Sequence, residues 1–337
     1  MRAVIGHKFG DFDDLRLEDV PRPSLEPGTI RILVHAAGVS FANLLFIAGK
    51  HQNRPSLPFI PGTEIAGLVA ELAPDAQTTL RVGDRVCASL PSGGFAEEAV
   101  VDAANVFKIP EALGFASATL FPTIYATAFA GLTWRANLKA GETLLVHGAA
   151  GASGLAGVEI GRAIGAQVIA VAGGERKIAT AKQHGANHAI DHKKQDFRKA
   201  VLEITGGRGA DVVFDPVGGD VFDNSLRCMA PLGRILPIGF ASGRIPAVPA
   251  NIILVKNLTV IGFYWGFYMG WGESRAGTAL RCQVRLMFEE LFGLYSAGKI
   301  RAPVDQVLPL SCFGEALRRI ERREVIGKIC LSPVDES

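Results

Sequence analysis

The sequence predicts an α/β protein in which a parallel sheet, covered by helices on both faces, is inserted into a second, mostly β unit. Three observations predict this organisation. A glycine-rich turn in the middle of the chain joins an apolar run to an apolar, helix-forming segment. Strand-like and helix-like segments then alternate. The residues before about position 120 have a different texture, with many Gly and Pro residues and few helical patterns.

The glycine-rich turn follows the apolar run 144–146 and leads directly into the helix-forming segment. That order places unhindered backbone N–H groups at a helix N-terminus, where the macrodipole favours the pyrophosphate of a dinucleotide. Glycine turns also join many strands to helices without binding anything, so the turn alone leaves both interpretations open. The candidate residues of the turn are Ala150, Gly151, Ala152, Ser153 and Gly154.

The alternation after the turn indicates a parallel sheet. The strand candidates are 167–172, 188–191, 210–215 and 234–239, and the helix candidates are 175–184 and 197–204. Strands that alternate with helical stretches of about ten to fifteen residues are typical of a parallel sheet with both faces covered. Together with the turn, these segments predict a Rossmann-type dinucleotide-binding domain.

The end of the second strand of this domain discriminates between the two nicotinamide cofactors. An NADH site usually has Asp or Glu about 20 residues beyond the glycine turn, where it accepts a hydrogen bond from the ribose 2′-OH. Here the strand runs into Gly173 without a carboxylate, and Glu175 is followed by Arg176 and Lys177. Two cations attract a 2′-phosphate, so the sequence favours NADPH. The alternative is that these cations form an ordinary solvated helix start.

The segments on either side complete the other domain. Strand candidates at 1–5, 30–37, 67–72 and 84–88 predict an all-β, barrel-like unit, and the C-terminal part has helix candidates at 278–296 and 314–323 and a last strand at 328–331. We predict that 1–122 and 265–337 form the mostly β domain and that 123–264 form the inserted domain. A cleft between two domains is a usual place for a substrate site.

The composition fits a two-domain enzyme without a nucleic-acid or membrane partner. A chain of 337 residues exceeds a typical single core, and a net charge of +2 gives no special attraction to nucleic acid or anionic lipid. No apolar run long enough to span a membrane escapes Gly, Pro or charge. The first residues resemble a strand rather than a signal peptide. The five cysteines are scattered without a C-x-x-C pair. We expect a cytoplasmic protein.

Six stretches then match a known family in order. They are 36–40 (AAGVS), 61–67 (PGTEIAG), 94–98 (GFAEE), 149–154 (AAGASG), 209–219 (GADVVFDPVGG) and 327–328 (GK). The chain resembles the zinc-independent, zeta-crystallin-like quinone oxidoreductase branch of the medium-chain dehydrogenase/reductase superfamily. The resemblance runs nearly end to end. It implies a GroES-like catalytic domain around a Rossmann domain, NADPH as cofactor, and a homodimer.

Zinc chemistry is disfavoured by the residues as well as by the resemblance. In the zinc-dependent relatives a cysteine follows the first barrel strand and a histidine precedes the glutamate of the 61–67 stretch. Ser40, after Val39, and Thr63 stand in those places here, and the four-cysteine structural lobe is missing. Catalytic zinc needs about three protein ligands, mainly with N or S donors. We therefore expect no metal.

The resemblance also implies roles at the cofactor. Gly151 and Gly154 match the pyrophosphate turn, Thr127 the threonine beside the nicotinamide, and Lys177 the lysine that pairs with the 2′-phosphate. His192 stands where relatives often have a tyrosine near the adenosine, and Arg323 where a C-terminal arginine reaches the same phosphate. Gly239 and Phe240 match the loop beside the nicotinamide ribose. Gly173, Arg176 and Phe263 complete the candidate cofactor-binding set.

The substrate side departs more from the relatives. Ser40, Asn43 and His51 are the polar groups that could hydrogen-bond a quinone oxygen. The alternative for Asn43 is a helix-surface or capping amide, and for His51 an exposed loop residue. A set of aromatic residues could line an apolar pocket for a flat ring or belong to the core: Phe46, Phe263, Tyr264 and Trp265.

The predicted function is NADPH-dependent reduction of quinones or other electron-poor conjugated carbonyls. Such acceptors need little acid–base help, so the protein contributes mainly orientation of the nicotinamide and exclusion of water. Hydrogen bonds from Ser40 or Asn43 would stabilise the developing oxyanion. Two alternatives remain open. One is a reductase of enoyl thioesters or other activated alkenes, which needs a proton donor such as His51. The other is a non-catalytic NADPH-binding protein.

Overall fold

The computed structural model describes residues 1–271 and 278–334. The chain divides into two compact units. The flanking unit contains residues 1–123, 265–271, 278–296 and 302–334 of the described chain, and the inserted unit contains Ile124–Tyr264 and Ala297–Arg301. The predicted fold class, a Rossmann-type domain inserted into a mostly β domain, is confirmed.

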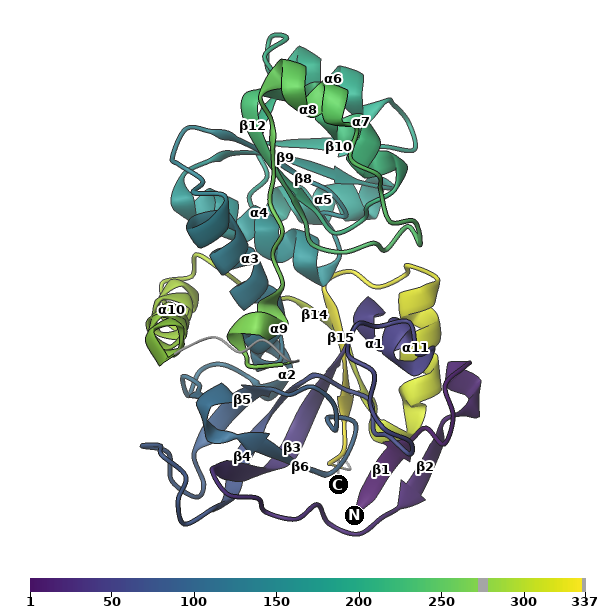
Figure 1. Cartoon of the computed structure of the whole chain (residues 1–337), viewed down its shortest axis with the longest axis vertical. Coiled ribbons are helices and arrows are strands. Elements are labelled where there is room, and N and C mark those ends of the chain that lie inside the picture. Colours follow the sequence, from purple (N-terminus) through teal and green to yellow (C-terminus); the bar gives the residue numbers. More distant parts are fainter. Residues whose placement is uncertain (272–277, 335–337) are drawn as a thin grey trace. The chain divides into compact units, whose positions relative to one another are not determined.

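The inserted unit is built on a six-stranded parallel sheet with the order β10-β9-β8-β11-β12-β13 (Figure 1). The order reverses between β8 and β11, and in open parallel sheets this switch point is where ligands bind beyond the carboxyl ends of the strands. The strands are β8 (Thr143–Val146), β9 (Gln167–Ala172), β10 (His188–Asp191), β11 (Ala210–Asp215), β12 (Met229–Pro237) and β13 (Thr259–Val260).

Helices cover both faces of this sheet. The helix α4 packs closely because Gly157 and Gly161 leave room for strand side chains; a Cβ at Gly161 would lie 2.4 Å from Leu144 Cδ2. On the opposite face, Phe222 and Leu226 of α7 join a buried apolar cluster with strand residues. The helices are α4 (Ala152–Ile164), α5 (Glu175–Gln183), α6 (Phe197–Ile204), α7 (Asp220–Cys228) and α8 (Ala250–Lys256).

A continuous helical stretch, Phe115–Arg135, leads into the inserted unit. It consists of α2 (Phe115–Ala118), the π-helical segment Phe121–Tyr125, α3 (Ala126–Ala130) and the π-helical segment Gly131–Arg135. By length and mean hydropathy, 1.3, this stretch could cross a membrane, although the sequence predicted no span. Its apolar window is 72% buried within the protein, as in the core helix of a globular protein.

The flanking unit is mostly β, as predicted. Its seven-stranded sheet has the order β14-β15-β3-β4-β5-β7, with β6 also paired to β3, and β1 and β2 form a separate pair. Its strands are β1 (Arg2–Ile5), β2 (Arg16–Asp19), β3 (Thr29–Val39), β4 (Glu64–Leu72), β5 (Arg85–Ser89), β6 (Glu98–Asp102), β7 (Val106–Lys108), β14 (Val304–Pro309) and β15 (Lys328–Ser332). Its helices include α1 (Phe41–Ile47), α9 (Trp265–Tyr268), α10 (Thr278–Ser296) and α11 (Phe313–Glu321), with short 3₁₀ turns η1 (Phe12–Asp14), η2 (Ala103–Asn105) and η5 (Leu310–Cys312).

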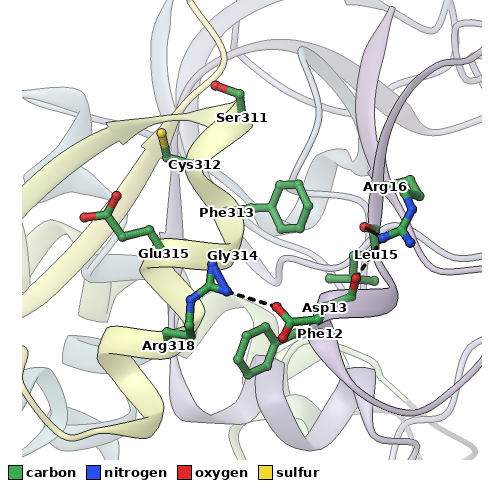
Figure 2. A pocket seen from close by; sticks show the side chains of 10 residues that line it. All are labelled: Phe12, Asp13, Leu15, Arg16, Ser311, Cys312, Phe313, Gly314, Glu315 and Arg318. Atoms are coloured by element: carbon green, nitrogen blue, oxygen red, sulfur yellow. Dashed lines mark hydrogen bonds and ion pairs between the residues drawn. The ribbon is translucent and has the colours of Figure 1, made fainter.

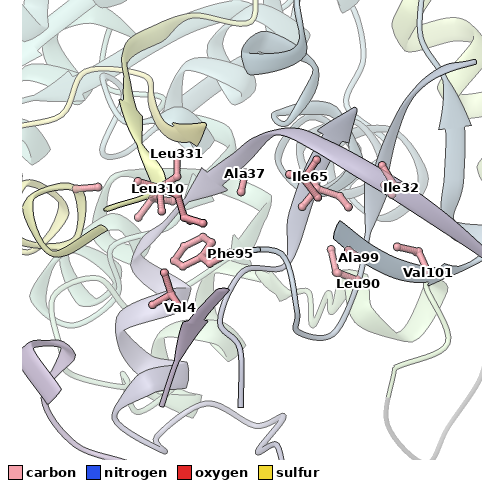
Figure 3. Close-up of a cluster of buried hydrophobic side chains, with 14 of the residues drawn as sticks. Val4, Ile32, Ala37, Ile65, Leu90, Phe95, Ala99, Val101, Leu310 and Leu331 are labelled. Atoms are coloured by element: carbon pink, nitrogen blue, oxygen red, sulfur yellow. The ribbon is translucent and has the colours of Figure 1, made fainter. Parts of the chain in front are cut away.

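One apolar core holds the flanking sheet together. Alternate residues of β3, such as Ile30, Ile32 and Val34, are fully buried, because successive side chains of a strand point to opposite faces. Figure 3 shows Ile32 in the same cluster as Phe95 and Leu331, which come from distant parts of the sequence. Closing this core therefore requires the C-terminal strand β15.

Three of the family-like stretches meet inside this sheet. Glu64 of β4 and Lys328 of β15 form an ion pair with both side chains 1% exposed. A side chain at Gly38 of β3 would place its Cβ 2.5 Å from Lys328 Cε. Because a buried charge without its partner costs several kcal/mol, the pair and the glycine beside it form one structural unit.

Candidate functional site

The glycine-rich turn connects β8 to α4 at the switch point. Gly148 has a φ of +57°, and Gly151 is the N-cap of α4 in an extended conformation. Gly154 is the position where only glycine fits, since a Cβ there would lie 2.2 Å from the carbonyl oxygen of Gly148. Gly151 is less restricted, because its Cβ would make an ordinary contact at 3.5 Å.

The start of α4 presents backbone donors. The Gly151 amide donates to Gly148 O at 3.0 Å, and the first intrahelical bond runs from the Leu155 amide to Gly151 O at 2.9 Å. The amides of Ala152, Ser153 and Gly154 precede that bond, and no acceptor for them exists within the described residues. Amides in this position bind anions. The turn thus fits a pyrophosphate group, through these three N–H groups rather than through Gly151.

The end of β9 is shaped by a carboxylate from the neighbouring strand. Asp191 Oδ1 accepts hydrogen bonds from the amides of Gly174 and Lys193, each at 3.0 Å. These two hydrogen bonds lower the pKa of Asp191. His192 lies against Gly173, where a Cβ would come within 2.8 Å of His192 Nε2. The structure thus brings together the predicted residues Gly173 and His192.

The first turn of α5 carries the predicted phosphate-binding cations. Arg176 is exposed and Lys177 is half-buried, at the second and third positions of the helix. Glu175 points to solvent, with its side chain 86% exposed, and forms an ion pair of 2.8 Å with Lys194. This pairing lowers the pKa of Glu175. Glu175, the one acidic residue in the first turn of α5, is therefore paired with Lys194.

The loop after β12 reaches the glycine turn through the turn that follows β11. The amide of Ala241 donates to Pro216 O at 3.2 Å, and that of Ser242 donates to Val217 O at 2.9 Å. Pro216 and Val217 in turn lie next to Gly148, where a Cβ would contact both side chains at 3.4–3.5 Å. Phe240 packs on Gly218. Gly239 and Phe240, two predicted residues, thus belong to one connected set of turns at the switch point.

Two further predicted residues of the inserted unit lie on or beside its entry helix. Thr127 is half-buried in α3. Phe263 is half-buried and close to Gly131, whose Cβ would lie 3.8 Å from Phe263 Cδ1. Arg323 lies in the flanking unit, where it is exposed after α11 with a φ of +57°. Its role at the cofactor phosphate stays a prediction.

His147 is a polar residue of this region that the sequence did not single out. It is 1% exposed, and its Nε2 donates to Ser225 Oγ at 2.7 Å. The Ser225 hydroxyl donates to Val221 O, which fixes that assignment. Burial lowers the pKa of His147 to about 3, so the imidazole is neutral. Asp215 was also missed, although an Asp followed by Pro and Gly residues is a turn signal.

Two residues that were predicted to face the substrate, Ser40 and Asn43, bond to each other. The amide of Ser40 donates to Asn43 Oδ1 at 2.7 Å, and its hydroxyl donates to the same oxygen at 3.1 Å. Asn43 is 0% exposed. Asn43 thus caps the N-terminus of α1 through its carbonyl oxygen, and its role toward a quinone oxygen stays a prediction. Its Nδ2 is buried and has no partner within the described residues.

His51 is a half-buried residue of the loop after α1. Its Nδ1 accepts a hydrogen bond from the Asn53 amide at 3.1 Å, and its ring centroid lies 6.2 Å from that of Phe46. Burial lowers the pKa of His51. The lowered pKa favours the neutral ring at neutral pH. Of the aromatic candidates, Phe46 and Trp265 are core residues at 2% and 5% exposed.

Hydroxyl groups stand at the two positions where zinc-dependent relatives carry ligands, Ser40 and Thr63. No group of three His, Cys, Asp or Glu side chains in the described part of the chain could hold a metal ion. A hydroxyl is not among the usual zinc donors, so the residues present do not fit a catalytic zinc.

A surface pocket in the flanking unit contains none of the predicted site residues (Figure 2). Phe313 of α11 projects into it, and Arg318 crosses it to form an ion pair of 3.0 Å with Asp13. Arg16, also in the lining, donates to the backbone carbonyl oxygens of Asp13 and Leu15.

Comparison with known proteins places the chain in a family. A model described as an alcohol dehydrogenase GroES-like domain matches residues 26–111, and one described as a zinc-binding dehydrogenase matches residues 152–279. The "quinone oxidoreductase-like protein 2 homolog" of Nematostella vectensis is 38% identical over 335 residues, covering 98% of this chain and 88% of that protein.

Two solved structures extend the comparison. The Escherichia coli quinone oxidoreductase complexed with NADPH is 27% identical, with a TM-score of 0.89 over 99% of this chain and 100% of that one. A mycobacterial protein complexed with NADPH is 28% identical, with a TM-score of 0.91 over the same shares. The chain belongs to the medium-chain dehydrogenase/reductase superfamily of oxidoreductases and, within it, to the zinc-independent, quinone oxidoreductase-like branch.

Proposed function

We propose that this protein is an NADPH-dependent reductase of quinones or related electron-poor conjugated carbonyls. The observation that carries the proposal is the start of α4, where three backbone amides have no acceptor in the described part of the chain and Gly154 leaves no room for a side chain. The NADPH complexes of two structural relatives support the choice of cofactor. The absence of a carboxylate at the end of β9 supports it independently.

The protein's own groups divide the work of holding the cofactor. The amides of Ala152, Ser153 and Gly154 bind the pyrophosphate, and the Lys177 ammonium binds the 2′-phosphate. Thr127 and the loop at Phe240 orient the nicotinamide end. When bound, NADPH supplies a hydride to the acceptor. The fold then contributes orientation and the exclusion of water.

The polar groups after β3 favour a quinone over an acceptor that requires a proton donor. The Ser40 hydroxyl is already donated to Asn43, and the lowered pKa of His51 keeps that ring uncharged near neutral pH. A quinone gains aromatic stabilisation on reduction and needs only modest stabilisation of its oxygen. An enoyl thioester must receive a proton at its α-carbon, which a neutral imidazole donates poorly.

The test is the oxidation of NADPH, followed by its absorbance, with a panel of quinones and with an acryloyl thioester. We expect turnover with quinones and little with the thioester. Turnover with the thioester alone would favour the alkene reductase. Tight NADPH binding without turnover of either would favour a non-catalytic binding protein. The cytoplasmic location and the homodimer stay predictions of the sequence.

A further inference from the structure

Asp215 ends β11 at the switch point and is 0% exposed. Its Oδ1 accepts hydrogen bonds from the amides of Val217 at 2.8 Å and Gly218 at 3.0 Å. Its Oδ2 is buried and has no hydrogen-bond partner within the residues that the structure describes. A buried carboxylate oxygen without a donor is costly when the group is ionised. Asp215 Oδ2 therefore needs either its own proton or a hydrogen-bond donor.

The turn that Asp215 organises touches two parts of the proposed cofactor site. The carbonyl oxygens of Pro216 and Val217 accept the amides of Ala241 and Ser242, which belong to the loop after β12. The side chains of Pro216 and Val217 face Gly148 of the glycine turn. Asp215 is therefore linked, through this turn, to two parts of the proposed cofactor site.

Within the described residues, no cation compensates the charge of Asp215. Burial raises its pKa to about 6, against the opposing effect of the two amides. From β8, His147 lies on the same face, one residue beyond the pair Phe214–Val146, and it is neutral. From β12, the neighbour in register is Pro237. On α7, the exposed Asp220 and the half-buried Asp223 are paired with Arg244, and Arg227 is exposed in the last turn of the helix.

Asp191 provides an internal comparison. It also ends a parallel strand, and its Oδ1 also accepts two backbone amides. Its pKa is nevertheless lowered, because there the hydrogen bonds outweigh the effect of burial. The two residues thus share one hydrogen-bond pattern, and Asp215 alone has an oxygen sealed from both water and donors.

We propose that Asp215 is a positioning residue for the cofactor and that it takes up a proton from solvent at Oδ2 when NADPH binds. The inference rests on the proposed NADPH function. The phosphates add negative charge beside the turn and the cofactor displaces water, and both effects disfavour the carboxylate. The protonated acid keeps Oδ1 as the acceptor for both amides. By linkage, NADPH must then bind more weakly as pH rises.

The test compares NADPH dissociation constants of the wild type and Asp215→Asn across pH. Asparagine keeps the Oδ1 acceptor and stays neutral, so it imitates the protonated acid. We expect the ratio of wild-type to variant Kd to rise by about threefold or more between about pH 5.5 and pH 8, since a complete linkage gives about tenfold per pH unit. The ratio cancels the titration of the cofactor's own 2′-phosphate.

Asp191→Asn is the matched control. Its Kd ratio to the wild type is expected to stay flat over the same range, because Asp191 is ionised throughout. A flat ratio for Asp215→Asn would overturn the inference while leaving NADPH binding intact. A wild type that binds no NADPH at any pH would overturn the proposed function as well, so the two failures are distinct.

A measurement on the wild type keeps the inference testable if Asp215→Asn does not fold. The infrared difference spectrum of NADPH binding is recorded at about pH 7.5, above the pKa of Asp215 in the protein without cofactor. It is expected to gain the carbonyl band of a protonated carboxylic acid. The same band must appear in Asp191→Asn. A spectrum without it would contradict proton uptake by Asp215.

Discussion

The residues predicted to hold the cofactor and those predicted to face the acceptor are built in different ways. In the inserted unit, the turn after β8 offers backbone amides, and its shape is set by Gly148 and Gly154. In the flanking unit, the residues after β3 offer side chains, but Ser40 and Asn43 already bond to each other. The first arrangement is ready for a ligand, whereas the second mainly stabilises its own helix.

This difference has a consequence for substitutions. Changes at the nucleotide side should alter cofactor binding strongly and selectively, because the amides at the start of α4 have no acceptor within the described residues. Changes after β3 should alter stability more than the rate with a quinone, since the groups there are engaged locally. Four substitutions test the comparison.

The largest effect is expected from Lys177→Ala. A charge-assisted hydrogen bond to a phosphate contributes about 1.5–3 kcal/mol, so kcat/KM for NADPH should fall by about ten- to a hundredfold. NADH lacks the 2′-phosphate, so its kcat/KM should stay within about twofold. Steady-state kinetics with both cofactors measures the change in preference.

Lys194→Ala serves as the control for Lys177→Ala, because it removes one positive charge from the same surface but takes it from Glu175. Its effect on NADPH should be smaller. An equal loss for NADH and NADPH in Lys177→Ala would contradict the assignment of Lys177 to the 2′-phosphate.

Gly154→Ala tests the shape of the turn. Its Cβ would lie 2.2 Å from Gly148 O, which is backbone and cannot move alone. Overpacking of this kind costs about 1–3 kcal/mol, so NADPH should bind at least about fivefold more weakly. Gly151→Ala, with its Cβ contact at 3.5 Å, should change the affinity less. Fluorescence titration measures the affinity for NADPH. An equal loss of affinity in both variants would contradict the assignment of the glycine turn to the pyrophosphate.

Much of the inserted unit could be predicted from sequence because its patterns are local. The strands 167–172, 188–191 and 210–215 and the helix 197–204 were predicted with the observed bounds. In the flanking unit, the helix 278–296 was too. Short apolar runs between glycine turns predict these elements. The fifth strand was placed at 234–239, but β12 starts at Met229 and ends at Pro237.

Elements that depend on tertiary partners were missed. The edge strand β13 has only two residues, too few for a periodic pattern. The helix α8 exposes Leu254 and Val255, at 76% and 74%, so its sequence lacks an amphipathic signal. The capping role of Asn43 depends on the burial of its side chain, which a single sequence does not reveal. The same holds for the unpartnered oxygen of Asp215.

Asn43→Ala should lower stability more than it lowers activity. The substitution leaves the amide of the half-buried Ser40 without its acceptor, which costs about 1–3 kcal/mol in the free energy of unfolding. Urea denaturation measures this loss. Ser40→Ala is the matched control, because it removes only the hydroxyl and keeps the amide bond to Asn43. An unchanged free energy of unfolding in Asn43→Ala would mean that the cap contributes nothing.

The smallest effect is expected from His51→Gln. Because burial lowers the pKa of His51, its charged form is populated at a lower pH than that of an ordinary histidine. Any stability lost by charging the buried ring is therefore lost as pH falls, not near neutrality. Between about pH 7 and pH 8 the rate with a quinone should change by less than about twofold and keep the wild-type pH profile. A large loss of rate, together with the disappearance of a protonation step from that profile, would instead make His51 the proton donor. That result would favour an activated alkene over a quinone as the substrate class.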